Sequence, residues 1–146
     1  ARISSHDHAG SGNANVTEKL LYVALNTNGF KVLNNRGTEV RYEKSDQYYV
    51  SVTAADGRVY AAGPNGTIDV FSVTDALNDA VATNSGGLSL EGSFDLGGLD
   101  EIGTGSGSIG SAQVNQILAT SDYLYVAAST EGTIVLEIAE NQGDIF

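Results

Sequence analysis

A segment of thirteen residues occurs three times in this chain, and its middle copy, residues 59–71, reads VYAAGPNGTIDVF. The first copy, residues 21–33, reads LYVALNTNGFKVL, and the third, residues 124–136, reads LYVAASTEGTIVL. In each copy two short runs of apolar and β-branched residues flank a Gly, which predicts two strands joined by a tight hairpin turn. Such turns need a residue with positive φ, and the positions expected to supply it are Gly29, Gly66 and Gly132.

The repeat extends beyond the hairpin. Residues 50–56 precede the second hairpin as residues 115–121 precede the third, and both runs predict a further strand. A fourth strand is expected at 39–44 after the first copy and at 88–95 after the second. Apart from a weak candidate at 74–82, no stretch keeps a helical apolar period. The fold class predicted is therefore all-β, built from four-stranded antiparallel propeller-like blades, two to three per chain.

The chain divides into an extended N-terminal arm, residues 1–17, and a propeller-like domain, residues 18–146. The domain contains a long Gly/Ser-rich loop at about 84–111. A closed propeller needs about 4–8 blades, which is more than the chain holds. We therefore expect a ring closed by oligomerisation, with a homotrimer favoured. The alternatives are a fragment of a larger propeller and a two-sheet β-sandwich.

The charge is divided unevenly along the 146 residues. The formal net charge is −11, yet all seven Lys and Arg lie in the first 58 positions, where six acidic residues leave a balance of +1. Residues 59–146 carry twelve acidic residues and no basic one, a balance of −12. Such a surface argues against nucleic acid and anionic membranes as partners, and it favours a high-salt environment in which its self-repulsion is screened.

Resemblances add to this interpretation. The repeat resembles the blades of secreted propellers, including the pyrroloquinoline-quinone-type group, which implies the fold and no catalytic residue. The N-terminal stretch SSHDH, residues 4–8, is similar to segments of tail-fibre and spike proteins of tailed viruses, especially those infecting haloarchaea. In such fibres His-x-His pairs bind metal ions. The resemblance implies that three chains together would bind a transition-metal ion through His6 and His8. The alternative is a solvated arm without metal.

Catalytic constellations are weak in this sequence. Both His lie in the arm, and no Ser sits in a Gly-x-Ser-x-Gly elbow, so a serine hydrolase is not expected. Residues 105–110 match the dinucleotide fingerprint G-x-G-x-x-G, but loop composition explains the match in an all-β context. Asp95, Asp100 and Glu101 cluster in the long loop. Carboxylates in a loop can perform glycoside hydrolysis or bind Ca²⁺, but these lack the spacing of a Ca²⁺ motif, and we expect solvated loop acids. We expect that the chain is not an enzyme and requires no cofactor.

The function predicted is a non-enzymatic virion-surface structural and adhesion protein, of tail-fibre, spike or turret type, that mediates host attachment. Its expected partners are other copies of itself, other virion proteins and a host-surface glycan or protein. The receptor-contact candidates are Tyr48, Tyr49 and Tyr123, since Tyr suits sugar and protein contacts. Tyr22, Tyr60 and Tyr125 recur with the repeat and are expected in the core. The alternative function is a blade segment of a secreted propeller enzyme or carbohydrate-binding protein.

Overall fold

The computed structural model describes most of the chain, namely residues 2–9, 17–34, 36–38, 40–73, 88–98, 113–129 and 131–138. Within these residues the chain forms eleven β-strands and one short 3₁₀ turn. In the part described, no helix has the length and apolar character needed to cross a membrane. The all-β class predicted from the sequence is confirmed.

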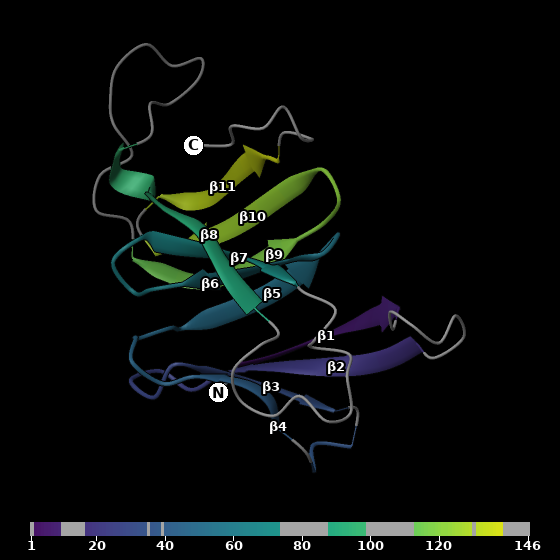
Figure 1. The fold of residues 1–146 in the computed structure, drawn as a ribbon. Helices are drawn as coiled ribbons and strands as arrows, with labels where there is room; N and C mark the ends of the chain where they lie inside the picture. Colours follow the sequence, from purple (N-terminus) through teal and green to yellow (C-terminus); the bar gives the residue numbers. More distant parts are fainter. Residues whose placement is uncertain are drawn as a thin grey trace.

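The strands form three antiparallel sheets that follow one another along the chain (Figure 1). The first sheet has the strand order β1-β2-β3-β4, with bounds Arg2–Ala9, Thr17–Ala24, Phe30–Asn34 and Val40–Lys44. Its β1 comes from the segment predicted as an arm, and it pairs with β2 along all of its residues. The N-terminal residues therefore complete the first sheet.

The second and third sheets repeat this meander. The second has the order β5-β6-β7-β8, with bounds Ser51–Ala55, Arg58–Ala62, Thr67–Val73 and Leu88–Asp95. The 3₁₀ turn η2, Leu96–Gly98, follows it. The third has the order β11-β10-β9, and its strands are β9 (Val114–Ala119), β10 (Tyr123–Ala128) and β11 (Gly132–Glu137). The strands expected at 39–44 and 88–95 are present as β4 and β8.

The three sheets are stacked as layers, with the second in the middle (Figure 1). Strand β5 contacts β1 and β2 on one side and β9 on the other. One apolar core lies between the first and second sheets and contains Tyr22, Phe30 and Phe71. The other lies between the second and third sheets and contains Tyr60, Ile68 and Leu124. A layered all-β fold of three sheets replaces the two-sheet sandwich considered as an alternative.

The hairpin turns have the backbone that the repeat predicts. The turn glycines have φ of 74°, 92° and 76°, at Gly29, Gly66 and Gly132. These are left-handed values, which glycine adopts without the steric penalty of a Cβ. The three repeated hairpins are therefore confirmed as β2–β3, β6–β7 and β10–β11.

The register makes the three sheets equivalent at their centres. In each hairpin the Tyr of the repeat lies directly across from a Val ten residues later, and the pairs are Tyr22–Val32, Tyr60–Val70 and Tyr125–Val135. Successive side chains of a strand point to opposite faces, so each sheet has one face that carries the Tyr–Val pair and one that does not. We call the first the Tyr face and the second the opposite face.

Candidate functional site

The histidines predicted as metal ligands lie on the first strand. Their backbones belong to β1, where His6 is paired with Leu20 and His8 with Glu18 of β2. Their side chains lie outside the described residues, so the metal site stays a prediction. Among the side chains that the structure describes, no three His, Asp or Glu are grouped so as to hold a metal ion.

The predicted receptor-contact tyrosines do not share one surface. Tyr48, in the connection between β4 and β5, is 46% exposed, and Tyr123, at the start of β10, is 41% exposed. Tyr49 is only 2% exposed, because its ring packs against Phe30 with centroids 5.5 Å apart. Its backbone is also bridged to Asn26 in both directions. Tyr49 is thus a core residue, and this corrects its choice as a surface contact.

Tyr49 belongs to a small polar network that extends from the core to the surface. Its hydroxyl donates a hydrogen bond of 2.5 Å to Asp69 Oδ2 on β7, and Ser93 Oγ on β8 donates to Asp69 Oδ1. Burial first, and then the hydrogen bond to Asp69, raise the pKa of Tyr49 above its ordinary value. The network fixes the β4–β5 connection to the second sheet, which is a structural role.

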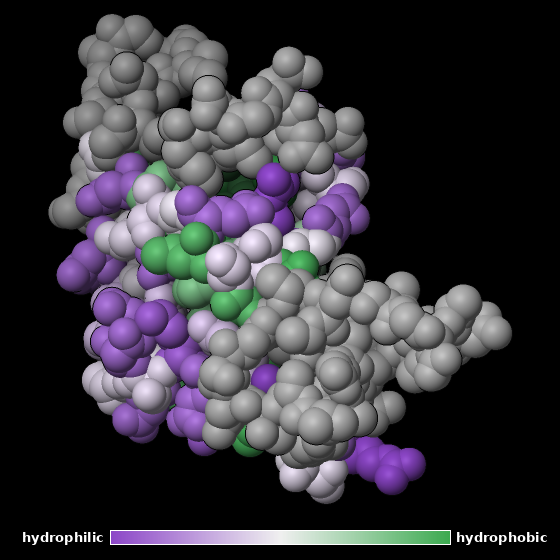
Figure 2. All heavy atoms as spheres, in the orientation of Figure 1, coloured by the Kyte–Doolittle hydropathy of each residue, from purple (hydrophilic) through white to green (hydrophobic). Residues whose placement is uncertain are grey.

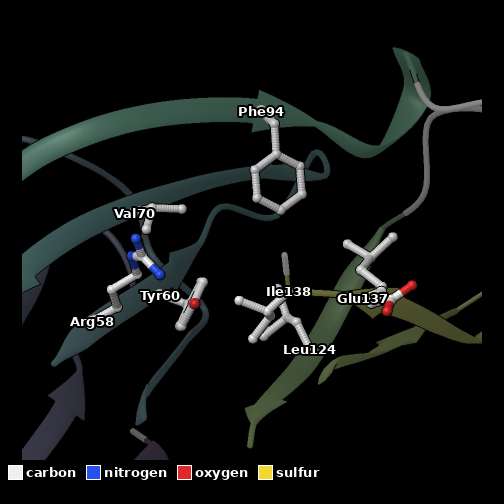
Figure 3. Close-up of a pocket in the computed structure, with 8 residues that line it drawn as sticks. Arg58, Tyr60, Val70, Phe94, Leu124, Glu137 and Ile138 are labelled. Atoms are coloured by element: carbon white, nitrogen blue, oxygen red, sulfur yellow. The ribbon is translucent and has the colours of Figure 1, made fainter. Parts of the chain in front are cut away.

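A small cavity lies where the second and third sheets meet. Phe94 points from β8 into the space bounded by Tyr60, Leu124 and Ile138 (Figure 3). The cavity volume is about 60 Å³, far below the ~300–1,000 Å³ of ordinary ligand pockets. Water or a methyl-sized group fits there, whereas a sugar ring or a cofactor does not.

The charged residues at this cavity are engaged with protein groups or solvent. Arg58 Nε donates to Glu91 Oε2 at 2.9 Å, and this ion pair joins β6 to β8. Burial raises the pKa of Tyr60, while Arg58 acts in the lowering direction. Glu137, the carboxylate that lines the cavity, is itself exposed. The cavity is thus a small gap between packed side chains of the second and third sheets.

The loop acids and the glycine fingerprint fall mostly outside the described residues, which is the case for Asp100, Glu101 and residues 105–110. Asp95 is described, and its Oδ1 accepts a hydrogen bond of 2.9 Å from the backbone N–H of Gly97. This contact caps the 3₁₀ turn and places the buried Leu96 in the core. For Asp95, the structure supports a role in shaping the chain.

The most distinctive surface is the Tyr face of the third sheet. Leu118, Tyr125 and Val135 lie side by side on β9, β10 and β11, and they are 55%, 37% and 53% exposed. Tyr123 stands next to them, with its ring centroid 6.2 Å from that of Tyr125. Apolar clusters that face solvent mark interaction surfaces in many proteins. We take this open Tyr face as the candidate functional site.

Of this site, sequence reasoning found the exposed Tyr123 but not Tyr125, Leu118 or Val135. Tyr22 and Tyr60 are buried as expected, but Tyr125 is exposed, although the repeat placed it in the core. The local sequence does not encode the order in which the sheets stack. Of the three Tyr faces, only that of the last layer is not covered by a described sheet. A second, isolated apolar residue is Leu90 of β8, which is 57% exposed. On the face over which β8 runs in Figure 1, Figure 2 shows a small hydrophobic area that hydrophilic residues border.

Comparison with known proteins gives no relatives to guide the interpretation. No protein family matches the chain, and no curated protein matches its sequence significantly.

Proposed function

We propose that this chain is a non-enzymatic structural and attachment protein whose sheets act as consecutive blades of a propeller-like head. In this proposal the head is displayed on a virion or another outer surface in a high-salt environment, and it contacts a glycan or protein of a host. The observation that carries the proposal is the repeated stacking of three similar sheets, together with an exposed aromatic ring, Tyr48, that lies outside the stacked faces.

The repeated stacking supports the blade interpretation. Three meanders follow one another in the chain, and their first strands β1, β5 and β9 lie next to one another. Propeller blades are also antiparallel meanders whose first strands lie together near the ring axis. The sheets therefore resemble propeller blades in the order of their strands and in the way they pack, and this resemblance favours blades over separate sheets.

The surface chemistry supports attachment over catalysis. Tyr48 and Tyr123 offer exposed rings, and Tyr contributes contact area at a low entropy cost. The described cavity is too small for an ordinary substrate. The resemblance of residues 4–8 to haloarchaeal virus fibres and spikes supports the viral form of the proposal, and the net charge of −11 supports solubility in salt.

The test is binding to whole cells. The protein is coupled to fluorescent beads and incubated with haloarchaeal cells in about 1 M NaCl, where the Debye length is about 3 Å. We expect retention of the beads, and roughly tenfold weaker retention after Tyr48→Ala, whose exposed ring lies in the β4–β5 connection and outside the Tyr face. Leu90→Ala, which removes an equally exposed side chain elsewhere, serves as the matched control.

Absence of retention on every strain tested would contradict the attachment proposal. Release of reducing sugar from cell-surface polysaccharide by the purified protein would instead support the alternative, a segment of a secreted propeller enzyme. Retention that free polysaccharide abolishes without hydrolysis would identify the host ligand as a glycan.

A further inference from the structure

We propose that the open Tyr face of the third sheet binds the opposite face of the first sheet of a second copy of this chain, head to tail. The inference rests on the stacked-blade part of the proposed function and is independent of what the head attaches to.

The two internal interfaces follow one rule. The Tyr face of the first sheet, with Tyr22 and Val32, packs against the opposite face of the second sheet, with Val59 and Ala61. All four of these side chains have no solvent exposure or almost none. A Tyr face is therefore covered by an opposite face, and not by another Tyr face.

The second interface repeats the rule. The Tyr face of the second sheet, with Tyr60 and Val70, packs against the opposite face of the third sheet, with Leu124 and Val126. The repeat makes Leu124 the equivalent of Val59, and Val126 the equivalent of Ala61. Two independent examples in one chain thus show which kind of surface covers a Tyr face.

The third Tyr face is the one that no described sheet covers. Its central row, Leu118–Tyr125–Val135, has the same register as Thr53–Tyr60–Val70 in the second sheet. Leu118 takes the place of a buried Thr, whereas Thr133 takes the place of the buried Ile68, so the apolar part of this face is its central row. The surface that fits it is one built like the opposite faces of the second and third sheets.

The chain itself offers such a surface on its first sheet. Leu21 and Val23 are the equivalents of Val59 and Ala61, and they lie opposite Leu33 and Lys31 on β3. All four side chains are half-buried. The equivalents of Leu21 and Val23 inside the stack, which are Val59, Ala61, Leu124 and Val126, are fully buried. A second copy can therefore supply the covering face that the rule requires.

Charge selects this orientation over a pairing of two Tyr faces. Residues 2–44 carry six basic and four acidic residues, a balance of +2, whereas residues 113–138 carry three acidic residues and no basic one. Two third sheets would bring −3 against −3, while the head-to-tail contact brings −3 against +2. The remaining charge of each copy still opposes association, so salt is expected to favour it.

The number of sheets in each copy indicates how many copies complete a ring. Each copy provides three sheets, so two copies make a ring of six and three copies make nine. Because propellers commonly have about 4–8 blades, two copies fit better than the trimer favoured by the sequence. We therefore expect a particle of about twice the 15.1 kDa chain mass.

The experiment measures mass by light scattering and affinity by analytical ultracentrifugation, in about 1 M NaCl to screen repulsion. Val135→Glu blocks the third-sheet face, and Val23→Glu blocks the first-sheet face. Lys31, across the hairpin from position 23, already forms an ion pair with Glu43, so the new carboxylate adds an uncompensated charge. Each variant alone is expected to dissociate, with an affinity roughly a hundredfold weaker, because a charge is buried in the contact. Leu90→Glu, a charge at an equally exposed position on β8, is the control and keeps the wild-type mass.

Mixing the two blocked variants gives the decisive result. In the mixture the intact Tyr face of Val23→Glu meets the intact first sheet of Val135→Glu, so mixed dimers with one good contact form. Dimers lost only in Val135→Glu, with no rescue on mixing, would overturn the proposal in favour of a Tyr-face to Tyr-face pair. Wild-type protein that stays monomeric would overturn it outright.

Two further measurements distinguish loss of the dimer from misfolding and from loss of attachment. Far-UV circular dichroism checks that each variant is folded, and Leu118→Gln replaces Val135→Glu if the latter does not fold. Bead binding to cells reports on attachment separately, since beads present many copies whether or not the free protein dimerises. A monomer that still binds cells refutes the docking proposal and leaves the attachment proposal standing.

Discussion

Thr53 Oγ1 accepts a hydrogen bond of 3.2 Å from the backbone N–H of Ala119, which joins the first strand of the second sheet to the first strand of the third. Ser51 Oγ makes the same contact with the N–H of Ile117 at 3.1 Å. Both groups are buried. β9 is the edge of its sheet, so these hydroxyls satisfy donors that strand pairing leaves open.

Replacing Thr53 by Val keeps the shape of the side chain and removes the acceptor. The N–H of Ala119 then stays buried without a partner, and the free energy of unfolding should fall by about 1–3 kcal/mol. Urea unfolding followed by circular dichroism measures the loss. Thr133→Val, on an exposed position of β11, is the control and should change stability by less than about 0.5 kcal/mol. Equal effects of both changes would contradict the bridging role of Thr53.

The turn glycines differ in what surrounds them. Gly29 and Gly132 have nearly the same φ, but a Cβ on Gly29 would overlap the backbone carbonyl of Lys44, whereas nothing lies near one on Gly132. Gly132→Ala should cost about 1–2 kcal/mol, the ordinary price of a left-handed residue. Gly29→Ala should cost clearly more, or prevent folding, because backbone must move. Thermal unfolding of the two variants compares them, and a smaller loss for Gly29→Ala would contradict the packing of β4 at this turn.

Val70 and Val135 occupy the same place in two repeats, one covered and one open. Val70→Ala should cost about 2 kcal/mol, because it removes buried methyl groups and leaves a cavity. Val135→Ala should cost less than about 0.5 kcal/mol when the protein is dilute enough to be monomeric. Denaturant unfolding at several protein concentrations measures both. A large effect of Val135→Ala in the monomer would mean that its face is covered within the chain.

Buried tyrosines make the fold sensitive to alkali. Burial raises the pKa of Tyr22, Tyr42, Tyr49 and Tyr60 above the ordinary 10.0. Because the protonated form is favoured in the folded state, the stabilisation is complete below pH 10 and is lost as the pH rises above it. Absorbance at 295 nm and circular dichroism should therefore change together above pH 10. Tyr49→Phe should remove one proton from this late titration, and early ionisation of all tyrosines in a folded chain would contradict the prediction.

Association should increase with salt. Each copy carries a net charge of −11, and raising NaCl from about 0.1 M to about 1 M shortens the Debye length from about 10 Å to about 3 Å. Sedimentation velocity across this range should show dimers replacing monomers. Potassium chloride at the same ionic strength is the control for a sodium-specific effect. An association that weakens steadily with salt would contradict this prediction. It would show that attraction between opposite charges at the contact outweighs the repulsion between the net charges of the two copies.

The sequence predicted the class, the three hairpins and their glycine turns, because alternation and positive-φ residues are local signals. It did not predict the strand at Arg2–Ala9, whose sequence has little β-branched character and which is defined by pairing with β2. The sequence placed Tyr49 with Tyr48 among the receptor contacts, but the packing of Tyr49 against Phe30 is a tertiary effect. The exposure of Tyr125 depends on the order of the layers, which no local pattern contains.

The middle sheet has consequences for how such a chain grows. Every residue of β5 is buried, because one neighbour covers each of its faces. Since each layer presents the same two kinds of face, duplicating the gene segment for one whole layer would insert a unit whose neighbours already suit it. Lengthening by layers would then require no new interface, whereas inserting a single strand would reverse the faces and disrupt the array. Natural variants of this architecture are therefore expected to differ in length by whole sheets.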